Sequence, residues 1–168
     1  MTATPKTGHS QKPKDHALEL LQFGHSVLMK QIESFPPDKA LFQPTPTDNH
    51  LMWTLGHLAM TYAWAVSLFD GKGVQLPESY EAKFSSGSKP TPNAADYPRL
   101  AELRRQFEAA YDEMVQTALG LSDEDLRVSI ADKTGGFATD RLDLLMKMSW
   151  HDGWHGGQLA SLTRAFKS

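Results

Sequence analysis

Residues 144–162 read LLMKMSWHDGWHGGQLASL, and the spacing of apolar and polar side chains in this stretch predicts a helix. One set of positions recurs every four or three residues: Leu144, Met148, His151, His155, Gln158 and Leu162. Because an α-helix has about 3.6 residues per turn, these side chains lie on one face. The face is apolar at both ends and polar in the middle. We therefore predict a helix from about Thr139 to Phe166 that turns two histidines and a glutamine toward the core.

The two histidines of this face indicate a metal site. His151 and His155 are four residues apart, so their imidazoles lie one turn apart on the same side of the helix. Each buried polar group without a partner costs about 1–3 kcal/mol, and one metal ion can satisfy several such groups at once. A catalytic site uses three protein ligands and leaves a position open. The alternative is a pair of core histidines hydrogen-bonded to backbone carbonyls.

A third ligand is expected from a facing helix. His57 is the best candidate because it lies in the most apolar helical stretch, 48–69, where an unpaired histidine is poorly solvated. Gly56 beside it would let another backbone come close. His25 is the second candidate, and we expect it to lie next to the ligands rather than to bind the metal. Gln158 is expected either to hydrogen-bond a ligand histidine or to join two helices.

The remaining histidines are weaker candidates. His50 lies near the start of the helical stretch 48–69 and is expected to be exposed to water. His9 and His16 lie in or beside the polar N-terminal segment. Asp143 and Asp152 are expected to be solvated or helix-capping acids.

Three further stretches complete the predicted architecture. Apolar residues recur at helical spacing over 15–35, 48–69 and 94–120, with Asp15 capping the first helix and Asp48 or Asn49 capping the second. We expect residues 1–14 to form a disordered tail, residues 72–95 to form a long surface loop, and residues 127–130 to be extended. The fold class predicted for the single domain 15–168 is an all-α four-helix bundle with long irregular connections.

Composition excludes several classes of function. The chain has 168 residues, 40% of them hydrophobic and 22% charged, and a net charge of −3, which disfavours a nucleic-acid partner. It contains no cysteine, so disulfides, thiolate nucleophiles and cysteine-based metal sites are excluded. No apolar run approaches the roughly 18 residues of a membrane span, and the N-terminus lacks a secretory pattern. We therefore predict no membrane association and a cytoplasmic location.

Two motifs resemble those of a known family. Residues 53–58, WTLGHL, and residues 151–159, HDGWHGGQL, are similar to motifs of the DinB/YfiT-like metalloenzymes, and Asn49 also fits. The resemblance covers about residues 15–166. It implies a four-helix bundle, often dimeric, in which His57, His151 and His155 bind a divalent metal ion such as nickel, zinc or iron. Gly156 departs from the family pattern, since many relatives carry a larger, often basic residue there.

The resemblance implies reaction classes but no single reaction. The family includes S-transferases and isomerases that use a low-molecular-weight thiol, together with hydrolase-like members. We therefore expect a metal-dependent transferase or hydrolase acting on a small molecule. The alternatives are a non-catalytic, stress-linked metal-binding dimer and a metal-free helical dimer. A homodimer is predicted because helix 139–166 carries a second apolar side and helix 48–69 is apolar all round. That second side consists of Leu142, Leu145, Met146, Trp150 and Trp154.

Overall fold

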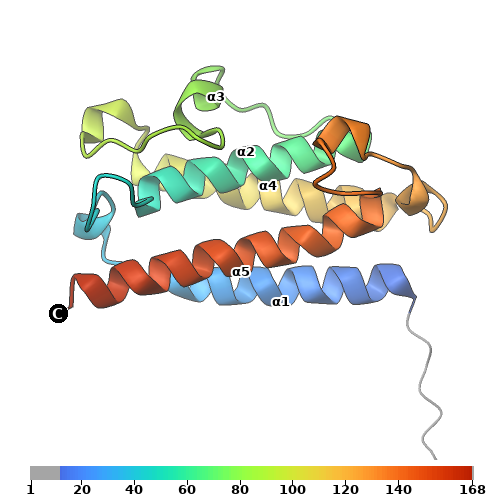
Figure 1. The fold of residues 1–168 in the computed structure, drawn as a ribbon, viewed down its shortest axis with the longest axis horizontal. Helices are drawn as coiled ribbons and strands as arrows, with labels where there is room; N and C mark the ends of the chain where they lie inside the picture. The colour runs from blue at the N-terminus through green and yellow to red at the C-terminus, as the bar shows by residue number, and fades with distance from the viewer. Residues whose placement is uncertain (1–11, 168) are drawn as a thin grey trace, which may run out of the picture.

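Four long helices lie side by side in a computed structural model that describes residues 12–167 (Figure 1). They are α1 (Pro13–Ser34), α2 (Leu51–Leu68), α4 (Leu100–Gly120) and α5 (Arg141–Ala165), and a short helix, α3 (Ser79–Phe84), joins α2 to α4. In this described part of the chain the extended structure is limited to one isolated bridge, between Ser129 and Asp140. The predicted all-α bundle is confirmed. Within the segment predicted as extended over 127–130, Ser129 forms one side of that bridge, whereas Arg127 ends the 3₁₀ turn Asp125–Arg127.

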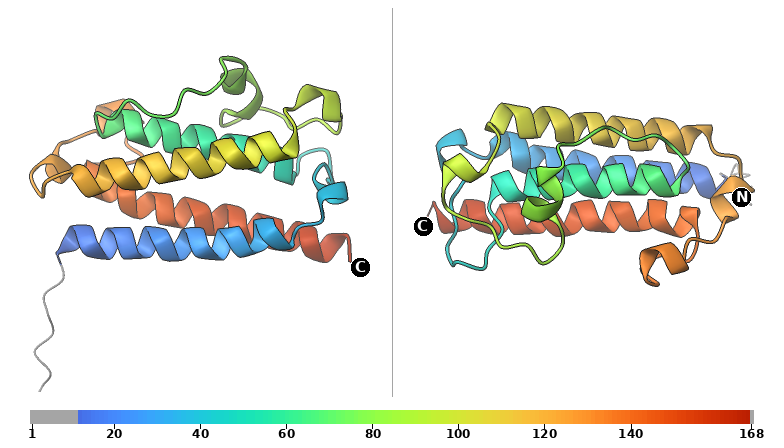
Figure 2. Two further views of the ribbon diagram at one scale, coloured as in Figure 1. Left: turned by 180° about the vertical axis from the view of Figure 1, so that it is seen from behind. Right: turned by 90° about the horizontal axis from the view of Figure 1, so that it is seen from above.

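The bundle consists of two helix pairs. α1 packs along α5, and α2 packs along α4, as the two views of Figure 2 also show. The side chains between the pairs form one apolar core, with Leu21, Leu55, Phe107 and Leu145 fully buried. Because α3 covers the outer side of α2, nearly every side of α2 is buried. This arrangement explains why the sequence of α2 is apolar all round.

The start of α2 differs from its prediction. The cap is His50, whose Nδ1 accepts a hydrogen bond from the Trp53 N–H at 3.1 Å, and neither Asp48 nor Asn49 caps the helix. His50 is fully buried and not exposed as predicted, because the segment around Thr91 lies over the helix start. The His50 Nε2 donates to the Thr91 carbonyl oxygen at 2.9 Å. Both ring nitrogens therefore have partners without any metal.

The connection predicted as a loop over 72–95 contains α3. The predicted start of the helix over 94–120 is also wrong. Ala94–Asp96 is a 3₁₀ turn capped by Asn93, and α4 begins only at Leu100. Pro98 stands between the two, and a proline disfavours helical backbone in the residue before it. α3 forms because Tyr80 and Phe84 bury their rings against the bundle.

The other helix ends lie close to their predicted positions. α1 begins at Pro13, two residues before the expected Asp15, so residues 13 and 14 are helical and not part of a tail. The rest of the predicted tail, including His9, lies almost wholly outside the described residues. Asp140 caps α5 by accepting from the Asp143 N–H at 2.8 Å, and Asp143 in turn accepts from the Thr139 N–H at 2.9 Å. Across residues 12–167, none of the helices has both the length and the apolar character that a bilayer crossing requires.

Candidate metal centre

Three histidine side chains meet between α2 and α5. His57 projects from α2, and His151 and His155 project from successive turns of α5. The Nε2 atom of His151 lies 3.2 Å from that of His57 and 3.3 Å from that of His155. The structure therefore brings together the three residues that the sequence predicted as ligands.

Hydrogen bonds at the far side of two rings fix which nitrogen faces the centre. The His57 Nδ1 donates to the Phe84 carbonyl oxygen at 2.8 Å, and the His155 Nδ1 donates to the Gln158 side-chain oxygen at 2.9 Å. Since these oxygens only accept, both Nδ1 atoms carry the proton and both Nε2 atoms present lone pairs. The Nε2 of His151 carries at most one hydrogen, so it can donate a hydrogen bond to only one of these two lone pairs.

A divalent cation fits this donor set. Zinc–imidazole bonds of 2.0–2.1 Å at tetrahedral angles place ligand nitrogens about 3.3 Å apart, close to the separations of 3.2 and 3.3 Å found here. Imidazole suits zinc, nickel, iron and copper. Hydrogen bonds from the outer ring nitrogen to a carbonyl or amide oxygen are usual for ligand histidines. Such a cation would satisfy all three converging Nε2 atoms at once.

The site keeps its histidines neutral. Burial lowers the pKa of His57, and burial with the neighbouring histidines lowers the pKa of His151 to about 4 and that of His155 to about 3. Metal ligation requires unprotonated imidazole nitrogens. At neutral pH all three rings are therefore ready to bind a cation without first losing a proton.

A glycine and two aromatic rings hold His57 in place. A Cβ at Gly56 would lie 2.5 Å from ring carbons of Phe84, so glycine here admits a side chain from α3 and not the backbone that was predicted. The Trp53 ring stacks on the His57 ring, with centroids 4.7 Å apart and planes 10° apart, and its Nε1 donates to Ser88. Sequence reasoning missed Phe84, whose role depends on how α3 folds back over α2.

Gln158 and His25 have different surroundings. Gln158 contacts a candidate ligand directly, through the His155 Nδ1, as one of its two predicted roles requires. His25 lies outside the three-histidine cluster, stacked on Tyr111 with ring centroids 3.4 Å apart. Its Nδ1 faces Asp152 at 3.7 Å.

Asp152 corrects a prediction. It is neither solvated nor a cap but fully buried, and one carboxylate oxygen accepts a hydrogen bond from the Tyr62 hydroxyl at 2.6 Å. Successive side chains on a helix point in directions about 100° apart, so Asp152 points away from the three-histidine cluster that contains His151 and into the core. Burial raises the pKa of Asp152, while the nearby His25 ring and the hydrogen bond from Tyr62 act in the opposite direction.

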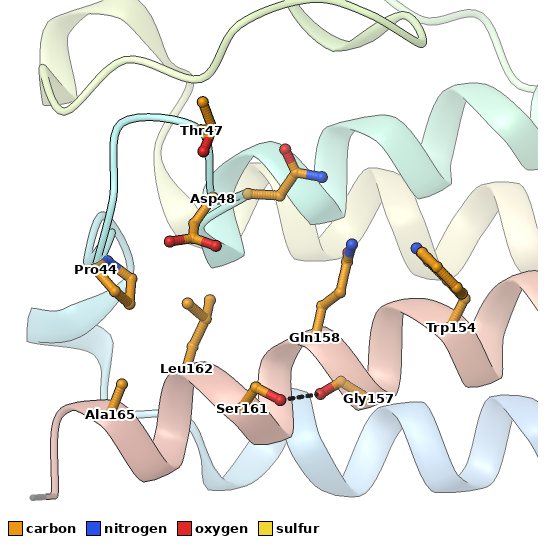
Figure 3. Close-up of a pocket in the computed structure, with 10 residues that line it drawn as sticks. Pro44, Thr47, Asp48, Trp154, Gly157, Gln158, Ser161, Leu162 and Ala165 are labelled. Carbon is orange, nitrogen blue, oxygen red and sulfur yellow. Dashed lines mark hydrogen bonds between the residues drawn. The ribbon is translucent and has the colours of Figure 1, made fainter.

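Two cavities flank the cluster. The cavity of about 550 Å³ in Figure 3 reaches Gln158 and Trp154, which project from α5 toward the start of α2, but none of the three imidazoles lines it. The cavity of about 470 Å³ opens onto His57 and His151. A small molecule could therefore reach a cation from this smaller cavity. It is lined further by Met60, Thr61, Trp64, Glu81, Phe84, Ser85, Ser86, Phe137 and Met148.

Comparisons with known proteins agree with the fold. The sequence profile described as the DinB superfamily matches residues 20–159. A crystal structure titled as the conserved protein of a locus from Enterococcus faecalis is similar to this chain, with a TM-score of 0.67 and 17% sequence identity. The similarity covers 92% of this chain and 97% of that one, and at this identity it shows the shared fold alone. None of the curated proteins compared with the chain matches it in sequence.

Proposed function

This chain belongs to the DinB superfamily, and we propose from that premise that it is a divalent-metal-dependent enzyme acting on a small molecule. His57, His151 and His155 would hold the ion. The observation that carries the proposal is the convergence of three Nε2 atoms: that of His151 lies 3.2 Å from that of His57 and 3.3 Å from that of His155. The lone pairs of the His57 and His155 Nε2 atoms are fixed by hydrogen bonds at Nδ1. The candidate metals are nickel, zinc and iron.

The chemistry follows from three neutral ligands and an adjoining cavity. When bound, a divalent cation acts as a Lewis acid that lowers the pKa of a water or thiol ligand. The chain supplies the imidazoles and a mostly apolar cavity beside two of them. In a transferase reaction, the sulfur of a low-molecular-weight thiol bonds to an electrophilic carbon, the leaving group departs with its electron pair, and the thiol proton passes to solvent. In a hydrolase reaction, water replaces the thiol.

The cavity favours an uncharged or cationic substrate with an apolar body. Glu81 is the one formally charged side chain among its described lining residues, and no lysine or arginine lines it to pair with a phosphate or carboxylate. Trp64 and Phe137, with ring centroids 6.5 Å apart, offer aromatic surface near its opening. A compact aromatic electrophile meets these requirements.

Metal content is the first test. Purified protein incubated with zinc or nickel and then desalted should retain one ion per chain, measured by elemental analysis. His57→Ala and His155→Ala should retain far less, whereas His16→Ala, a change at an exposed histidine of α1, should retain one. A wild-type content near zero after incubation contradicts the proposal.

Activity and stability separate an enzyme from a metal-stabilised module. The loaded protein should join a thiol such as cysteine to the neutral electrophile monochlorobimane with loss of chloride, or should hydrolyse 4-nitrophenyl acetate. His155→Ala should abolish this activity while the melting temperature stays close to that of the metal-free wild type. Unfolding of His155→Ala would instead favour the alternative, a non-catalytic protein in which the ion stabilises the fold.

A second copy of the chain is the proposed protein partner. Three exposed apolar residues of α1, Leu20, Phe23 and Val27, and three of α5, Met146, Trp150 and Trp154, are each between 37% and 66% exposed. Aromatic side chains present about 150–250 Å² when fully exposed, so these six present on the order of 500 Å² of apolar surface. Each partner of a standard interface buries about 800 Å², more than half of it apolar, so this apolar area is enough for such an interface.

Light scattering tests the dimer. The wild type should have twice the chain mass of 18.7 kDa. Phe23→Glu and Trp150→Glu should yield monomers, and Val128→Glu, which changes an exposed apolar residue on the α4–α5 connection, should remain dimeric. A monomeric wild type refutes this part of the proposal. A cytoplasmic location and, on the ground of the net charge of −3, the absence of a nucleic-acid partner remain part of the same proposal.

A further inference from the structure

The candidate metal centre lies between two helices, α2 and α5, neither of which is the other's main packing partner. α2 packs mainly along α4, and α5 packs mainly along α1. One ligand candidate comes from α2 and the other two come from α5. The distance and register between these two helices therefore decide whether the three Nε2 atoms converge. Any direct link between α2 and α5 bears on the site.

One such link is a buried hydrogen bond between Tyr62 and Asp152. The Tyr62 hydroxyl on α2 donates to a carboxylate oxygen of Asp152 on α5 at 2.6 Å, and both residues are fully buried. Tyr62 follows His57 by five residues, and Asp152 directly follows His151. The bond therefore joins the two helices within about one turn of the cluster on each side.

The same carboxylate also faces α1. Its second oxygen lies 3.7 Å from the His25 Nδ1, and neither of these two buried atoms has a hydrogen-bond partner among the described residues. The His25 ring is held from the other side by its stack on Tyr111 of α4. Asp152 thus lies where α1, α2 and α5 meet.

A buried carboxylate is an expensive way to fill this space. Desolvating it costs more than burying an apolar side chain of similar size, and the hydrogen bonds it receives restore only part of that cost. What a charge-assisted hydrogen bond adds is direction, because its geometry is narrower than that of apolar contacts. The position therefore suits a residue that fixes one helix against another.

We propose that Tyr62 and Asp152 are positioning residues of the metal centre, whose hydrogen bond sets α5 against α2 so that His151 and His155 face His57. This inference rests on the proposed metal function. Neither residue lines the cavity onto which His57 and His151 open. Their effect is therefore expected on metal affinity and coordination geometry.

Cobalt binding tests the inference without an activity assay. Co²⁺ is titrated into metal-free protein at a temperature where circular dichroism shows each variant folded, and the visible absorption of the bound ion is followed. Tyr62→Phe and Asp152→Asn should each bind Co²⁺ about 10- to 100-fold more weakly, with altered visible bands. The double variant should bind no more weakly than the weaker single variant, because both changes remove the same bond. Should Asp152→Asn fail to fold, Tyr62→Phe alone decides.

Two controls separate positioning from general destabilisation. Tyr111→Phe removes a neighbouring hydroxyl that forms no hydrogen bond to Asp152 in the described structure, and Ile130→Ala truncates a buried residue in the α4–α5 connection. Both should bind Co²⁺ as the wild type does. Wild-type affinity in Tyr62→Phe, or an equal loss in Ile130→Ala, overturns the positioning role and leaves the metal centre standing. A wild type that binds no Co²⁺ overturns the metal centre and this inference with it.

Discussion

Gly56→Ala should weaken both the fold and the metal site, because a methyl group there has no room. The new Cβ would lie 2.5 Å from two ring carbons of Phe84 and 2.6 Å from a third. Carbon atoms in contact are about 3.5–4.0 Å apart, so the ring must withdraw by at least about 1 Å. Phe84 is fully buried beside Tyr80, so such a movement displaces α3.

The displacement reaches the metal site through one hydrogen bond. The Phe84 carbonyl oxygen accepts from the His57 Nδ1 at 2.8 Å, and a shift of about 1 Å breaks that bond. Loss of such a partner of a ligand histidine weakens metal binding about 10- to 100-fold, or about 1.4–2.7 kcal/mol. Overpacking itself costs about 1–3 kcal/mol of folding free energy.

Gly153→Ala is the matched control. Gly153 also lies inside a helix, but no atom lies within 4 Å of its added Cβ, so the change should stabilise the protein by about 0.5–1 kcal/mol. Urea denaturation of the metal-free proteins should separate the two variants by at least the clash energy of about 1–3 kcal/mol. Zinc affinity is measured by competition with a chelator. A Gly56→Ala variant as stable as Gly153→Ala, with wild-type zinc affinity, would refute the reasoning.

Three further predictions concern acid, Gln158 and the α1–α5 contact. The metal-free protein should lose stability as the pH falls from about 6.5 toward 4. Histidines of the unfolded chain take up protons in that range, whereas in the folded protein His151, with a pKa of about 4, and His155, with a pKa of about 3, stay neutral. Each histidine changes the free energy of unfolding by up to about 1.4 kcal/mol per pH unit. Urea denaturation at pH 7, 5.5 and 4.5 should therefore show a free energy of unfolding that falls as the pH falls, and His155→Gln should reduce this dependence. A free energy that does not change with pH would contradict the prediction. Gln158→Leu should weaken zinc binding about 10- to 100-fold in a chelator competition, since the His155 Nδ1 loses its acceptor at 2.9 Å, and unchanged affinity would count against that role. Gly24→Ala should destabilise the protein by about 1–3 kcal/mol, because the new Cβ would lie 2.9 Å from the backbone oxygen of Ser149. A melting temperature equal to that of the wild type would exclude this clash.

The ligand candidates could be found from the sequence because their signal is local. His151 and His155 occupy a helical face whose flanking positions, Leu144 and Leu162, are apolar, so periodicity alone turns them inward. His57 could be found because the sequence of its helix is apolar on every side, so that a histidine in the middle of the helix is expected to be poorly solvated. No knowledge of neighbouring segments was needed in either case.

The errors arose where burial depends on segments distant in the chain. The sequence predicts Asp152 to be solvated or to cap a helix, because a carboxylate inside a core is tolerated only with a partner. Its partner Tyr62 lies 90 residues earlier in the chain. His50 was expected to be exposed, because its buried state depends on the segment around Thr91, 41 residues away. Neither of these distant partners can be identified from the pattern of residues near Asp152 or His50.

Of the two hydrogen bonds that orient the candidate ligands, one could be predicted from nearby residues and the other depends on a distant segment. Gln158 lies three residues after His155, so helical geometry places its amide within reach of the ring, and the contact could be predicted. The acceptor for His57 is a backbone carbonyl 27 residues away, and every residue has such a carbonyl. Residue type therefore gives no information about which one is used. It is the absence of a side chain at Gly56 that lets the Phe84 ring, and with it this carbonyl, approach α2. A glycine next to a partly buried histidine thus indicates room for a distant segment rather than a local feature of the helix.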